Sequence, residues 1–207
     1  MRADDSLPWD RLPAVHEGID ADLSDWSVSP DVDDLVRRAD LVVYAEVVSE
    51  IKPDVAETQQ RESADHGLGA AHYILSPVAF AKGEAEVRPG ARPGSQPGGI
   101  QVQQYATWFD GERDRPDWNV PLEAGQRYLL FLRYVPDSDL PGVVYPHIHL
   151  EIDGNLYWNG AKGWRDNGPS DPQIGRDESV PLMAFWQMPV DEALAMVRDV
   201  VRSQATQ

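Results

Sequence analysis

The chain has 207 residues, of which 42% are hydrophobic, and a formal net charge of -17. This length and apolar content suit one good-sized core, so we expect a single domain with long polar loops. The acidic balance leaves no basic face to hold phosphates, and it excludes nucleic acid as the expected partner. The chain has no cysteine, which excludes disulfides, thiolate metal sites and cysteine nucleophiles.

Residues 1–30 form an acidic, proline-containing segment. Because no basic start is followed by a long apolar run, the segment predicts neither a secretory signal nor a transmembrane helix. We expect it to be flexible and residues 31–207 to form the one domain. Two compartments fit the sequence. The protein is extracytoplasmic, with residues 1–30 as a tether, if a signal or lipid anchor was trimmed, and it is otherwise cytoplasmic.

The first predicted elements are a helix and two strands. Residues 31–39 predict a two-turn helix, with aspartates at its start and arginines at its end, as the helix dipole favours. Residues 41–51 are rich in β-branched side chains and predict a strand. Residues 71–81 predict a second strand, in which Pro77 indicates an edge or a bulge, and Lys82-Gly83 closes it.

The stretch 120–135 (VPLEAGQRYLLFLRYV) predicts the central strand, and residues 100–106 predict the strand before it. Its apolar side chains alternate between two faces, with Tyr128, Leu130 and Leu132 on one and Leu129 and Phe131 on the other. A strand that is apolar on both faces needs neighbours that cover each of them. We therefore expect Leu130 and Leu132 to be buried.

A hairpin and a helix follow. Residues 145–152 and 155–158 flank Asp153-Gly154, a dipeptide typical of the two-residue hairpin turn in which both positions have positive φ. Pro189 then opens a helix over 190–203, where apolar residues recur on one face. We expect this face to pack on the sheet.

In order, these elements predict a mainly β fold, a five- to six-stranded closed barrel with a short N-terminal helix and a C-terminal helix. Lys82-Gly83 after the second strand and Gly125-x-Arg127-Tyr128-Leu129-Leu130 at the central strand resemble the netrin-like form of the oligonucleotide/oligosaccharide-binding (OB) barrel. This form occurs in tissue inhibitors of metalloproteinases and in many bacterial proteins. The resemblance covers about residues 35–160 and implies a binding role, without the zinc-chelating cysteine of those inhibitors.

The sequence His147-Ile148-His149-Leu150-Glu151 places His147, His149 and Glu151 on one face of a strand, because alternate residues point the same way. Two imidazoles and a carboxylate are suitable ligands for zinc, with His72 as a candidate fourth ligand from another strand. The alternative is the solvated face of an amphipathic strand, with Ile148, Leu150 and Ile152 toward the core.

The seven tryptophans are a second candidate feature. Four of them lie in or beside the loops expected to rim one end of the barrel: Trp108, Trp118, Trp158 and Trp164. They are predicted either to stack on a ligand or to cap the barrel end and cover the loops. A two-residue hairpin turn would place Trp158 opposite His149.

Loop carboxylates such as Asp110 with Asp117, or Asp166 with Asp171, would suit calcium or glycoside hydrolysis. With 35 acidic residues, such clusters arise by chance, and no nucleophile motif accompanies them. We expect a non-enzymatic binding or scaffolding domain, without a cofactor, that recognises a protein or a glycan through its loop-bearing end and outer hairpin face. The alternative is a metal-dependent hydrolase that uses His147, His149 and Glu151. The oligomeric state stays open.

Overall fold

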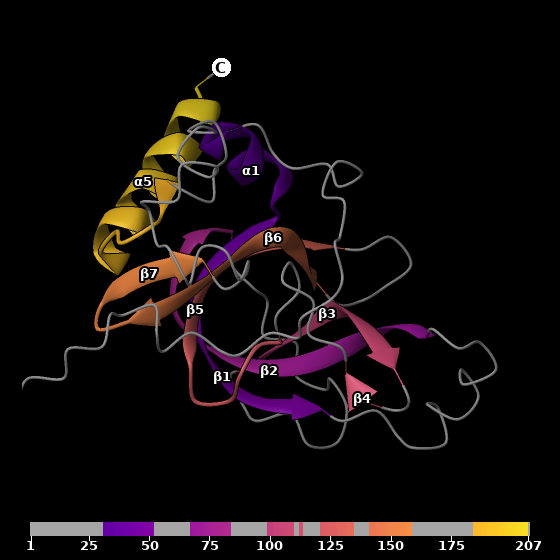
Figure 1. Cartoon of the computed structure of the whole chain (residues 1–207). Coiled ribbons are helices and arrows are strands. Elements are labelled where there is room, and N and C mark those ends of the chain that lie inside the picture. Colours follow the sequence, from indigo (N-terminus) through magenta and orange to yellow (C-terminus); the bar gives the residue numbers. More distant parts are fainter. Residues whose placement is uncertain are drawn as a thin grey trace, which may run out of the picture.

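The computed structural model describes residues 31–51, 67–83, 99–109, 112–113, 121–134, 141–158 and 184–206. It shows a mainly β fold, an antiparallel sheet flanked by two helices (Figure 1). The elements are α1 (Val32–Arg38), β1 (Leu41–Ile51), β2 (Gly67–Lys82), β3 (Ile100–Phe109), β4 (Glu112–Arg113), β5 (Arg127–Tyr134), β6 (Pro141–Ile152), β7 (Asn155–Trp158) and α5 (Val190–Gln204). The predictions for residues 1–30, for Trp118 and Trp164, and for the loop carboxylates Asp110, Asp117, Asp166 and Asp171 lie outside the described residues.

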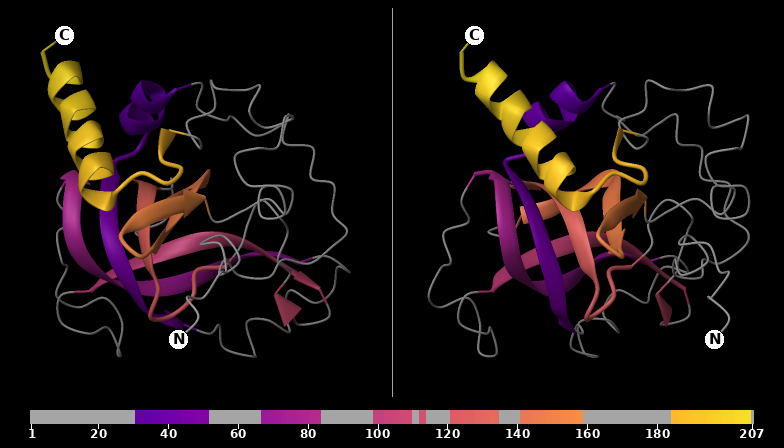
Figure 2. Two further views of the ribbon diagram at one scale, coloured as in Figure 1. Left: turned by 60° about the vertical axis from the view of Figure 1, so that its left-hand side comes forward. Right: turned by 90° about the vertical axis from the view of Figure 1, so that its left-hand side faces the viewer.

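The strands follow the order β4-β3-β2-β1-β5-β6-β7, and all neighbours in this order are antiparallel. The sheet is strongly curved (Figure 2), and β3 meets β6 through one parallel bridge, between Gln103 and Gly142. Closure would need a continuous ladder between these two strands. The sheet is therefore not closed into a barrel, and the expectation of a closed barrel is wrong.

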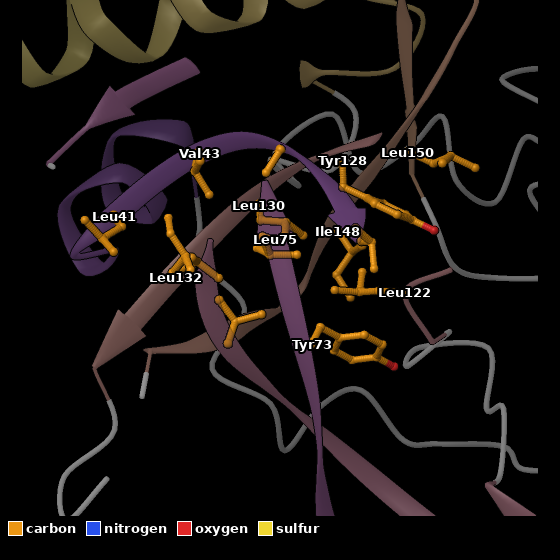
Figure 3. Packing of buried hydrophobic residues seen from close by; sticks show 14 of the residues in the cluster. Leu41, Val43, Tyr73, Leu75, Leu122, Tyr128, Leu130, Leu132, Ile148 and Leu150 are labelled. Atoms are coloured by element: carbon orange, nitrogen blue, oxygen red, sulfur yellow. The ribbon is translucent and has the colours of Figure 1, made fainter. Parts of the chain in front are cut away.

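The first core fills the concave side of the sheet. Figure 3 shows Leu75 of β2, Leu130 of β5 and Ile148 of β6 among its buried side chains. Tyr128, Leu130 and Leu132 all belong to this core and are fully buried, as predicted for one face of the central strand. Leu129 and Phe131 on its other face are buried in a second core.

The second core lies between the sheet and the two helices, which pack side by side (Figure 2). Asp31 caps α1, because its carboxylate accepts a hydrogen bond of 2.7 Å from the Asp34 N–H. The buried face of α5 includes Val190, Leu194 and Val197, which confirms the predicted apolar stripe. Within the described part of the chain, neither helix is long and apolar enough to span a membrane.

The predicted break at Pro77 is present. Ala79 of β2 pairs with Tyr44 and Pro77 pairs with Ala45, so a register shift leaves Val78 without a Cα partner in β1. The β2–β3 pairing ends earlier, at Leu75. Pro77 therefore lies at a bulge and where one side of β2 has no described strand beside it, a position that tolerates the loss of an N–H donor.

The hairpin between β6 and β7 also forms as predicted. Asp153 and Gly154 have φ of 53° and 85°, as a type I′ turn requires. The edge of β7 that does not pair with β6 is covered by the segment just before α5. The Leu156 N–H donates to the Met188 carbonyl at 2.9 Å, and the Gln187 N–H donates to the Leu156 carbonyl at 2.8 Å. These bonds use backbone groups that an uncovered edge strand would expose.

Candidate functional site

Three uncharged polar side chains lie together on the convex side of β2 and β3. Tyr73, Leu75 and Val102 point into the first core, so alternation places His72, Gln101 and Gln103 on the opposite face. His72 is paired directly with Gln103, and its Nδ1 atom lies 3.3 Å from Nε2 of Gln101. We call these three residues the amide face.

Residues of β1 lie beside the amide face. Ile51 is paired with His72, so the row across the three strands reads Ile51, His72, Gln103. The next row across the same three strands reads Ser49, Ile74, Gln101, and the last two of these residues are buried. The charged Glu50 is paired with Tyr73 and alternates to the other side. Along these two rows, the described side chains therefore include no carboxylate, lysine or arginine.

His72, Gln103, Ser49 and Ile51 are half-buried, whereas Gln101 is 8% exposed. Gln101 is the most buried of these five side chains and contacts His72, so its amide restricts the orientation of the imidazole ring. A half-buried polar group can still reach a ligand, and its orientation is restricted by its neighbours. Of the polar side chains in these two rows, Ser49, His72 and Gln103 are thus the ones that remain partly exposed.

A second polar group lies on the convex side of β1, β5 and β6. Nε of Arg127 is 3.4 Å from Oε2 of Glu46, and the Tyr44 hydroxyl is 3.4 Å from Oε2 of Glu151. Burial, followed by the negative charge of Glu151, raises the pKa of Tyr44. Opposite charges are already paired here, and the exposed Glu46–Arg127 pair contributes little to stability.

The third polar group lies inside the concave side and is structural. The Gln104 side-chain oxygen accepts from the Leu122 N–H at 3.4 Å, and the Tyr128 hydroxyl accepts from the Glu123 N–H at 3.1 Å. Burial raises the pKa of Tyr128 well above its ordinary value. Both bonds hold the segment before β5 against the core.

The predicted zinc ligands are in a different environment from the one expected. His149 is fully buried, with its ring centroid 4.9 Å from that of Phe185 and 6.2 Å from that of Phe131. The expectation of a solvated face is wrong at this position, because the segment before α5 brings Phe185 against it. Ile148, Leu150 and Ile152 are buried in the first core, as predicted.

Glu151 is engaged in the hairpin turn, where its Oε1 atom accepts from the Gly154 N–H at 2.6 Å. The side chain of His147 lies outside the described residues, and His72 is on β2 beside Gln101. Within the part of the chain that the structure describes, no three His, Asp or Glu side chains are grouped as metal ligands. The zinc site over His147, His149 and Glu151 stays a prediction.

Of the four tryptophans, Trp158 is described in full. It is paired with His149, as the predicted turn requires, and it is 3% exposed. Trp108 is opposite Gly67 in the β2–β3 ladder, and its side chain lies outside the description. Trp186 was not among the predicted site residues, and its ring packs edge-on against Tyr157 at a centroid distance of 5.3 Å.

The amide face was also missed, although the alternation Gln101-x-Gln103 within a predicted strand was a signal for a polar face. No protein-family model matches the sequence, and no curated protein is significantly similar to it.

Proposed function

We propose that this chain is a non-enzymatic binding or scaffolding domain that recognises a protein or a glycan, and that the amide face is its recognition surface. The observation that carries the proposal is the 3.3 Å contact between His72 and Gln101, next to the directly paired Gln103. Side chains that hold one another in place lose less conformational freedom when a ligand binds.

The strand arrangement supports a netrin-like, OB-like domain. In the order β3-β2-β1-β5-β6 the strands surround one core, and β3 approaches β6 in parallel. A five-stranded, partly open Greek-key barrel has this character. The two motifs behind the resemblance lie at the end of β2 and at the turn into β5, where the chain changes direction. Fold alone does not assign function, so the site carries the argument.

The amide face replaces the outer hairpin face as the proposed contact surface. His149 and Trp158, which would have formed the hairpin patch, are 0% and 3% exposed. The same burial weakens the case for the hydrolase, because a catalytic metal needs an open coordination position for water or substrate. Glu151 is moreover engaged by the Gly154 N–H.

Affinity capture with matched variants tests the proposal. Immobilised full-length chain is incubated with envelope and cytoplasmic fractions of the source organism, alongside the double variant His72→Ala, Gln103→Ala and the control Gln126→Ala. Gln126 is exposed in the turn before β5, so it provides the same chemical change away from the amide face. We expect a partner that the wild type and the control retain and the double variant loses. Equal retention by all three would exclude the amide face as the recognition surface.

A further inference from the structure

We draw no further inference here: the strongest candidate, the edge of β2 beyond Leu75, where the pairing with β3 ends and Val78 is 56% exposed, carries nothing, because nothing in the described part of the chain shows what covers this edge.

Discussion

The Nζ atom of Lys82 on β2 lies 2.6 Å from the carbonyl oxygen of Ala39, the C-cap residue of α1. The same ammonium donates to the Val36 carbonyl at 2.7 Å. The last carbonyls of a helix have no partner within the helix, and a cation there also interacts favourably with the helix dipole. Lys82 therefore joins the short helix to the sheet.

Replacing this ammonium should destabilise the domain. We expect Lys82→Met, which keeps the aliphatic stem, to lower the free energy of unfolding by about 1–3 kcal/mol, because two buried carbonyls lose a charged donor. Denaturant unfolding measures the change, with Lys82→Arg as the conservative comparison. An unchanged midpoint for Lys82→Met would show that the contact contributes nothing.

Gly83 and Gly125 form a matched pair for a second prediction. Both have positive φ, 67° and 82°, but a Cβ at Gly83 would meet the Asp40 carbonyl oxygen at 2.8 Å and the Leu41 side chain at 2.7 Å, whereas one at Gly125 would meet nothing within 4 Å. Gly125→Ala should cost about 1 kcal/mol for the backbone conformation alone. Gly83→Ala should cost clearly more, because backbone must also move. Equal midpoints in thermal or urea unfolding would contradict this ranking.

The raised pKa of Tyr128 predicts how the free energy of unfolding depends on pH in the alkaline range. Burial raises its pKa above the ordinary value of 10.0, so the folded chain keeps the phenol neutral while the unfolded chain ionises it. The stabilising contribution is complete below about pH 10 and is lost as the pH rises from there toward the folded-state pKa. Urea unfolding across this range should show a falling free energy. In Tyr128→Phe the fall should be shallower, and an identical slope would remove Tyr128 as the cause.

Elemental analysis decides between the binding domain and the hydrolase. Protein purified without chelators should contain zinc well below one ion per chain, because His149 packs against Phe131 and Phe185 and Glu151 holds the hairpin turn. The double variant His147→Ala, His149→Ala is the comparison. Stoichiometric zinc in the wild type that disappears in the double variant would favour the hydrolase.

Secondary-structure elements that depend on residues close together in the chain were predictable from the sequence. The first strand has the predicted bounds, Leu41–Ile51, because a run of β-branched residues favours extended backbone. The hairpin at Asp153-Gly154 forms because these two residues tolerate positive φ. The burial of Leu130 and Leu132 follows from a strand that is apolar on both faces.

Strand ends were predicted less well where distant pairing sets them. The second strand begins at Gly67, four residues before the predicted start, because Gly67 pairs with Trp108 at the far end of β3. Backbone pairing of this kind can override weak local propensity. The failure of the sheet to close is likewise a matter of how β3 and β6 approach each other.

The candidate sites depended most on tertiary structure. The alternation of His147, His149 and Glu151 along a strand, and the position of Trp158 opposite His149, could be predicted because strand period and turn length are local properties. The packing of the folded chain was needed to show that His149 is covered by Phe185, 36 positions later, and that His72 contacts Gln101 on a neighbouring strand. Burial and side-chain contact are set by residues far apart in the chain, and no local pattern encodes which of them will cover a given face.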